Sequence, residues 1–246
     1  VNRLMENPAL AARFQILCIP GGFSYGDDIA AGRILAARLQ LHLRDFLTEF
    51  TQRSDRLVLG ICNGMQVMMR LGVLTPQAVA AGVQDSVSGA EANLRADSDA
   101  ATLTWNNHGR FEDRWVNLAV DPASPCVFLR GVESMYLPIA HAEGKFMAAD
   151  EQQLAEMRSA GQLALRYCDG QPGEDLDSPL AFPSNPNGAQ ANVAGVCDPS
   201  GRVFGLMPHP ERHVDVTHHP AWTRKTAIDQ TPDGLAIFQN AIRYFE

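Results

Sequence analysis

The sequence lacks the features of a membrane protein or a nucleic-acid-binding protein. It contains no apolar run approaching the roughly 20 residues of a membrane-spanning helix, and no charged-then-apolar leader opens it. Lysine occurs only twice, the arginines form no basic stripe, and the formal net charge is −8. We therefore expect no membrane span and no nucleic-acid partner.

Cysteine is scarce, and its spacing excludes two common uses. The five cysteines are Cys18, Cys62, Cys126, Cys168 and Cys197. They are odd in number and widely spaced, and no two form a C-x-x-C pair, so neither a structural zinc site nor a disulfide framework is expected. Free thiols suit a reducing compartment, and we expect a cytoplasmic protein.

Motifs for nucleotides and metals are also missing. Neither G-x-x-x-x-G-K-[ST] nor G-x-G-x-x-G after a strand occurs in the chain. Four histidines lie between residues 209 and 219, but Pro210 breaks the helix on which H-x-x-x-H metal binding depends. We expect no metal or cofactor on this chain, and any ATP chemistry must belong to another chain or a missing part.

What the sequence does contain is typical of a globular protein. Of its 246 residues, 46% are hydrophobic and 20% are charged, which allows a substantial buried core. No internal repeat, low-complexity tract or linker divides the chain, so one domain over residues 1–246 is predicted. The first residue is Val1 rather than methionine, which leads us to expect that an upstream segment has been lost or removed.

Apolar runs and helical periodicities alternate along the chain. Residues 14–19 and 57–61 predict buried strands, and apolar residues from Leu35 to Phe50 predict a helix between them. Residues 65–71 predict a second helix. Further strands are predicted over residues 114–120, 163–167 and 203–207. This alternation indicates an α/β fold, a three-layer sandwich around a mostly parallel sheet.

Polar residues mark the starts of two later helices. Asp150 and Gln153 have the spacing of a capping box. Thr231 is a suitable N-cap, with Pro232 at the first helical position. The final helix would then bury an apolar face formed by Leu235, Phe238, Ile242 and Phe245.

A candidate nucleophile follows the strand at residues 57–61. The segment from Gly60 to Gly64 reads G-x-C-x-G, the thiol version of a nucleophile elbow, in which small residues let a sharp strand-to-helix turn close. Cys62 would lie at a helix N-terminus, where the dipole and free N–H groups favour a thiolate. The alternative is a small buried cysteine at a strand end, so the pattern alone is only suggestive.

A candidate base follows the strand at residues 203–207. His209 lies between Pro208 and Pro210, and Glu211 follows two residues after it. Glu211 could therefore orient the His209 ring. An isolated histidine is more often structural. Its combination with the Cys62 elbow favours catalysis.

Pro20-Gly21-Gly22 ends the strand at residues 14–19. Glycines allow backbone N–H groups to point into a site where an oxyanion forms, and the N–H of Asn63 would supply a second donor. A simple turn is the alternative for these glycines.

Five longer motifs carry a family resemblance. They are PGGFSYGDD (20–28), LGICNGMQ (59–66), PIAHAEGKF (138–146), FPSNPNGAQANVAGV (182–196) and MPHPER (207–212). Together they resemble the class I, or triad, glutamine amidotransferases, which have a flavodoxin-like fold. Within that class, the chain is similar to the glutaminase subunits and domains of phosphoribosylformylglycinamidine synthases.

The resemblance implies a role for each site residue. It implies that Cys62 forms a glutamyl thioester, with His209 as acid and base and Glu211 as its partner. It implies an oxyanion hole at the Gly21-Gly22 turn and Asn63.

By the same likeness, Gln66 lies near the bound glutamine, and His141 lies near the site or the partner face. The resemblance also implies a synthetase partner that holds ATP and Mg²⁺ and uses the ammonia to make an amidine, and it leaves room for a small accessory subunit.

The chain departs from the family pattern in two places. Nothing matches the family's first strand and its Gly-x-Asn-Cys-Asp-like loop, so we expect an N-terminally truncated domain that lacks its first strand. Ala142 stands where the family has glycine, which would alter the backbone near His141 if a positive φ is needed there. An amidotransferase for another acceptor and a non-catalytic glutaminase-like binding subunit are the alternative functions.

Overall fold

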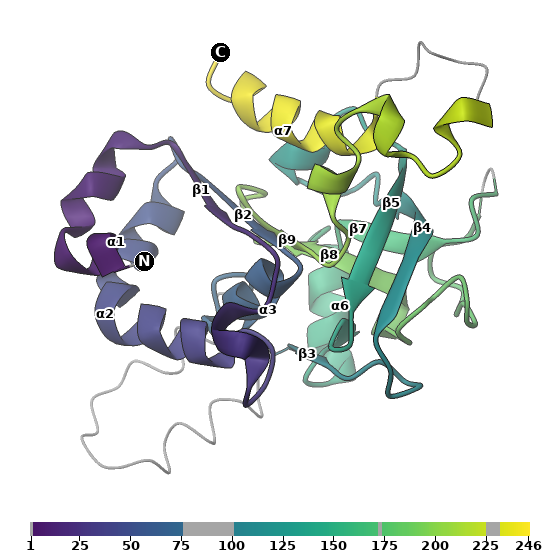
Figure 1. The fold of residues 1–246 in the computed structure, drawn as a ribbon, viewed down its shortest axis with the longest axis horizontal. Helices are drawn as coiled ribbons and strands as arrows, with labels where there is room; N and C mark the ends of the chain where they lie inside the picture. Colours follow the sequence, from purple (N-terminus) through teal and green to yellow (C-terminus); the bar gives the residue numbers. More distant parts are fainter. Residues whose placement is uncertain (1, 76–100, 172–173, 225–231) are drawn as a thin grey trace.

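A computed structural model describes residues 2–75, 101–171, 174–224 and 232–246 (Figure 1). The strands are β1 (Ile16–Ile19), β2 (Leu57–Ile61), β3 (Thr102–Thr104), β4 (Glu112–Val120), β5 (Ser134–His141), β6 (Lys145–Met147), β7 (Leu165–Cys168), β8 (Val193–Cys197) and β9 (Val203–Leu206). The α-helices are α1 (Asn2–Glu6), α2 (Arg33–Gln52), α3 (Asn63–Arg70), α6 (Glu151–Ser159) and α7 (Asp233–Arg243). The 3₁₀ helices are η1 (Pro8–Arg13), η2 (Ser24–Asp27), η3 (Val127–Leu129), η4 (Gln190–Asn192), η5 (Pro210–Arg212), η6 (Val216–His218) and η7 (Trp222–Arg224).

Seven strands form one mixed sheet in the order β1-β2-β9-β8-β7-β4-β5, and β3 pairs with β6 separately. The α/β class is confirmed, but the expectation of a mostly parallel sheet is wrong. Only the β1–β2 and β2–β9 pairs are parallel, and the other four pairs of this sheet are antiparallel. Helix α2 crosses over between β1 and β2. The chain instead reverses between β4 and β5, through a connection that contains η3, and between β8 and β9, through a short connection.

The parallel part of the sheet positions the candidate site. Strand β2 lies between β1 and β9, and every residue of β2 is buried, as its continuous apolar run Leu57–Ile61 predicts. In Figure 1, α3 lies below this part of the sheet and α7 lies above it. Strand β1 is the first strand of the described chain and forms one edge of the sheet.

All five predicted strands are present, with bounds shifted by two residues or fewer, as β1, β2, β4, β7 and β9. The predicted helices also form. Asp150 Oδ1 accepts the backbone N–H of Gln153 at 2.7 Å, as predicted. The Gln153 side chain instead accepts the N–H of Ala149, one residue earlier than a capping box requires.

The start and the buried face of the last helix differ from the prediction. Thr231 lies outside the described residues, and Pro232 is the N-cap rather than the first helical residue. Helix α7 buries Gly234, Ile237, Asn240 and Ala241. Ile242 of the predicted face is 59% exposed. A search for apolar spacing misses this face because Asn240 belongs to it, donating to the carbonyls of Phe128 and Arg130.

Within the described part of the chain, no helix is both long enough and apolar enough to cross a membrane.

Candidate active site

Cys62 occupies a strained turn between β2 and α3. Its φ is 50° and its ψ is −107°, a conformation that residues other than glycine rarely adopt, and α3 begins at the next residue. The side chain is 5% exposed. The strand–turn–helix geometry of a nucleophile elbow, predicted from G-x-C-x-G, is therefore present.

The two glycines of this motif are required by close packing. A Cβ at Gly64 would overlap the carbonyl oxygen of Ile19 in β1, and a Cβ at Gly60 would overlap the sulfur of Met68. Since backbone atoms of β1 cannot move without disturbing the sheet, Gly64 permits the close approach of α3 to β1. This confirms the steric reason that the sequence suggested for both glycines.

His209 and Glu211 reach the same edge of the sheet from β9. Ile61 is paired with Leu206, so the residues that follow the two strands lie near one another. His209 is 5% exposed, and its Nδ1 lies 2.6 Å from Glu211 Oε1. Burial opposes ionisation of Glu211, but the hydrogen bond and charge of His209 outweigh it, and the pKa of this carboxyl is lowered. The pairing that the sequence predicted is present.

Gly21 brings the histidine and the cysteine together. A Cβ at this position would lie 3.0 Å from His209 Cε1 and 3.4 Å from Cys62 Cβ, so the glycine packs directly against both residues. Nε2 of His209 is buried and has no hydrogen-bond partner among the described residues. The Cys62 thiol instead donates to the carbonyl of Ala140 at 3.7 Å. The two catalytic candidates are adjacent without being hydrogen-bonded, as is common in unliganded active sites.

The resting Cys62 side chain is a neutral thiol. Burial raises the pKa of this thiol to about 12, and the backbone N–H of Asn63 only partly offsets the effect. The thiolate expected from the helix N-terminus is therefore not favoured in the unliganded chain. Desolvation wins because Cys62 is almost completely covered, whereas α3 is only two turns long.

The β1–α2 loop, residues 20–32, includes Gly21 and therefore borders Cys62. Gly22 has a φ of +116°, which favours glycine, and a Cβ there would meet no other atom within 4 Å. Its conformation rather than crowding therefore explains glycine at this position. The loop contacts α3 through Asn63, which accepts the N–H of Ser24 at 3.4 Å.

Gln66 is buried in a polar network beside the elbow. Its Nε2 donates to the carbonyl of Glu143 at 2.6 Å, and its Oε1 accepts from Asn63 Nδ2 at 3.0 Å. The side chain thus ties α3 to the segment after β5. Sequence reasoning missed two further members of this network, Asp27 and Glu143, although both lie inside the quoted motifs. The motifs gave no sign that their carboxylates contact backbone N–H groups.

His141 lies at the end of β5 and is 3% exposed. Both of its ring nitrogens lack a partner among the described residues. Burial, together with the charge of His209, lowers the pKa of His141 to about 3, so its ring is neutral. A side chain at Gly144 would overlap this ring. Ala142 does not have a positive φ, so the alanine in the H-A-E-G stretch does not strain the backbone.

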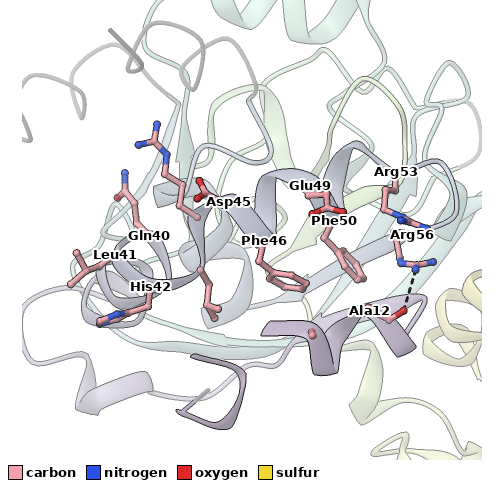
Figure 2. Close-up of a pocket in the computed structure, with 13 residues that line it drawn as sticks. Ala12, Gln40, Leu41, His42, Asp45, Phe46, Glu49, Phe50, Arg53 and Arg56 are labelled. Atoms are coloured by element: carbon pink, nitrogen blue, oxygen red, sulfur yellow. Dashed lines mark hydrogen bonds between the residues drawn. The ribbon is translucent and has the colours of Figure 1, made fainter. Parts of the chain in front are cut away.

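Two other regions lie apart from this arrangement. His213 and His219 pack around Trp115 and Tyr136, with ring centroids 5.1 to 5.9 Å apart. No group of three or more His, Cys, Asp or Glu side chains in the described ranges is placed to hold a metal ion. Figure 2 shows a pocket lined by residues of α2, by Ala9 and Ala12 of η1, and by Arg53 and Arg56, which follow α2. None of the predicted site residues lines it.

Comparison with known proteins gives one consistent result. Residues 1–245 match a family described as a CobB/CobQ-like glutamine amidotransferase domain. The phosphoribosylformylglycinamidine synthase subunit PurQ of Dehalococcoides mccartyi is 40% identical over 244 residues, which are 99% of this chain and 85% of that protein. The subunit of the same name from Methanococcus maripaludis is 38% identical, over 100% of this chain and 86% of that protein. A solved structure of PurLQS from Thermotoga maritima superposes with a TM-score of 0.59 at 26% identity, covering 95% of this chain and 81% of that one.

Proposed function

The chain belongs to the CobB/CobQ-like glutamine amidotransferase family, and from this premise we propose that it is the glutaminase component of a phosphoribosylformylglycinamidine synthase. The proposal is supported by the names and coverage of its relatives. The single observation that carries the chemistry is the position of Cys62. It lies on a strained elbow close to His209, and Nδ1 of this histidine contacts Glu211.

In the proposed reaction, Cys62 Sγ attacks the carboxamide carbon of glutamine while its proton passes to His209 Nε2. The neutral resting thiol requires this transfer to accompany attack, because little thiolate exists beforehand. Glu211 orients the imidazole and stabilises the imidazolium that forms.

The tetrahedral intermediate carries negative charge on the former carbonyl oxygen. The N–H groups of Gly22 and Asn63 are the proposed donors to it, at the β1–α2 loop and at the start of α3. Collapse breaks the C–N bond, and His209 gives its proton to the leaving nitrogen, which departs as ammonia. Water then attacks the thioester, with His209 taking its proton, and glutamate leaves as Cys62 regains a proton.

The proposed partner is a synthetase subunit that consumes the ammonia. It would hold ATP and Mg²⁺ and convert formylglycinamide ribonucleotide to the amidine, with a small accessory subunit as a further component. Gln66 and His141 are proposed to line or support the glutamine site. Both are buried next to the elbow, in the case of Gln66 through direct hydrogen bonds to Asn63 and the Glu143 carbonyl.

The test is glutamate release from glutamine by the chain mixed with its synthetase. We expect Cys62→Ser to abolish release, because a hydroxyl has a far higher pKa than a thiol and is a poor nucleophile without matched activation. Cys18→Ser is the matched control, since this cysteine is exposed on β1, and it should retain activity. Release by Cys62→Ser at the parent rate would exclude the thioester mechanism.

A further inference from the structure

The β1–α2 loop contains an unusual backbone turn. Tyr25, Gly26 and Asp27 have φ values of 54°, 72° and 54° in succession. Tyr25 and Asp27 are thus held in a left-handed conformation that residues with side chains rarely adopt. Such a conformation persists only where surrounding contacts hold it, and it occurs often at functional sites.

The Asp27 carboxylate supplies those contacts. Its Oδ1 accepts the backbone N–H of Gly32 at 3.0 Å and Asn63 Nδ2 at 3.1 Å, and its Oδ2 lies 3.3 Å from the same Nδ2. Asn63 Oδ1 in turn accepts the N–H of Ser24. The buried Asn63 side chain therefore contacts the loop on both sides of the Tyr25-Gly26 turn.

These contacts join the loop to the element that carries the nucleophile. Asn63 directly follows Cys62, and Gly21, at the start of the same loop, packs against Cys62 and His209. A shift of the loop beyond Gly21 would move the N–H of Gly22 relative to Cys62.

We propose that Asp27 is a positioning residue: through Asn63 it holds the β1–α2 loop so that the Gly22 N–H faces the developing oxyanion. The inference rests on the proposed function, because only an acyl-transfer reaction needs that donor. Asn63 would then have two roles. Its side chain would hold the loop, and its backbone N–H would donate to the oxyanion.

The far end of the loop has anchors of its own. The N–H of Ala31 lies 3.3 and 3.4 Å from the two carboxylate oxygens of Glu143, and its carbonyl accepts from Arg70 Nε at 3.1 Å. Loss of the Asp27 contacts should therefore loosen the part of the loop next to Gly22, while Ala31 keeps its contacts with Glu143 and Arg70. The expected defect is in catalysis rather than in folding.

The test is Asp27→Asn in the complex with the synthetase. The amide has the same shape, and its one oxygen can still accept from Gly32, but an NH₂ donor replaces the second carboxylate oxygen. That donor meets the Asn63 Nδ2 donor, so the contact with Asn63 is weakened. We expect kcat for glutamine hydrolysis to fall about 10- to 100-fold with little change in KM, because a misplacement of about 1 Å at a reacting centre can cost about 10²-fold. Asp28→Asn is the matched control, since in the described part of the chain its carboxylate makes no hydrogen bond or ion pair, and it should leave kcat unchanged.

Alkylation of Cys62 by iodoacetamide separates positioning from general damage. This reaction displaces iodide at a saturated carbon and forms no oxyanion, so Asp27→Asn should leave its rate little changed. Asn63→Ala is a second variant that keeps the backbone N–H. Its effect on kcat should add only partly to that of Asp27→Asn, because both variants weaken the same contact between Asp27 and Asn63.

Three results would overturn the proposal: an unchanged kcat in Asp27→Asn, an equal loss in Asp28→Asn, or a change in alkylation as large as the change in hydrolysis. If the parent complex itself releases no glutamate, the proposed function fails first and this inference fails with it. If the parent complex is active and Asp27→Asn has the same kcat, only the positioning role of Asp27 is refuted.

Discussion

Gly21 lies so close to His209 that a Cβ at this position would be 3.0 Å from the Cε1 atom of the imidazole. The two residues come from loops that follow different strands, β1 and β9, which are separated in the sheet only by β2. The absence of a side chain at residue 21 therefore sets how closely the histidine approaches Cys62. A turn alone would require only backbone freedom at this residue, whereas the packing here also leaves little room for a side chain.

Gly21→Ala should impair glutamine hydrolysis more than stability. The added methyl group would displace the His209 ring from Cys62, and we expect kcat to fall about 10- to 100-fold, as for other small misplacements of catalytic groups. Steady-state kinetics and thermal unfolding of the same preparations measure the two effects. Gly131→Ala is a useful control, because Gly131 has a positive φ of 71° and open space around it. It should cost stability and leave kcat unchanged, and the reverse pattern would contradict the packing argument.

Glu211→Gln should slow turnover while the chain stays folded. The carboxylate lies 2.6 Å from His209 Nδ1, and the amide loses the charge that stabilises the imidazolium. Loss of an orienting carboxylate costs up to about 10⁴-fold in a Ser-His-Asp triad, and we expect a smaller loss with a thiol nucleophile. Glu133→Gln is the control, because Glu133 is exposed and directly precedes β5. Parent-like kcat in Glu211→Gln would show that another group orients His209.

The reactivity of Cys62 should keep rising with pH in the unliganded chain. Burial raises the pKa of this thiol to about 12, so below that value each pH unit increases the thiolate fraction about tenfold. Alkylation by iodoacetamide, followed by mass spectrometry of the peptide containing Cys62, should show a rate that climbs without a plateau from neutral pH into the alkaline range. Glutathione, measured in parallel, should level off first. A plateau near neutral pH would mean that the helix N-terminus prevails over burial after all.

The synthetase should activate the glutaminase site. His209 Nε2 has no partner among the described residues, and the Cys62 thiol donates to the Ala140 carbonyl, so a partner that turns the thiol toward His209 would increase turnover. A partner that favours the competent arrangement by about 1–3 kcal/mol would raise turnover about 5- to 150-fold. Titration of the chain with synthetase and its substrates measures this. If turnover is already maximal without synthetase, activation by the partner is refuted, but the assignment of the chain as a glutaminase is not.

The sequence indicated the parallel part of the fold well, because its signals there are local. The run Leu57–Ile61 followed by G-x-C-x-G fixes a buried strand, a turn and a helix from neighbouring residues alone. The site pair His209 and Glu211 was found for the same reason, since both follow directly on the apolar strand β9.

The antiparallel part was only partly foreseen. Strand β5 contains Pro138, which argues against a strand in a sequence pattern, yet β5 forms an edge of the sheet, where a missing N–H is tolerated. The buried face of α7 was misjudged because a polar residue, Asn240, belongs to it through contacts with residues more than 100 positions away. Contacts with such distant residues do not appear in the hydrophobic periodicity of the sequence.

The charge state of Cys62 could not be inferred from local sequence either. A helix N-terminus and a free N–H are visible as a motif, but the burial that raises the thiol pKa comes from the whole surrounding fold. The same holds for Asp27, whose contacts with Asn63 join the β1–α2 loop to the start of α3.

The most direct measurement follows the amide nitrogen of glutamine into the product. The chain and its synthetase would be supplied with formylglycinamide ribonucleotide, ATP, Mg²⁺ and glutamine labelled with ¹⁵N at the amide, and the amidine would be analysed by mass spectrometry. We expect the label in the amidine with the parent chain and none with Cys62→Ser, while both complexes still make amidine from added ammonium chloride. Label transferred equally by Cys62→Ser, or no transfer by the parent complex although ammonium is used, would contradict the assignment of this chain as the glutaminase.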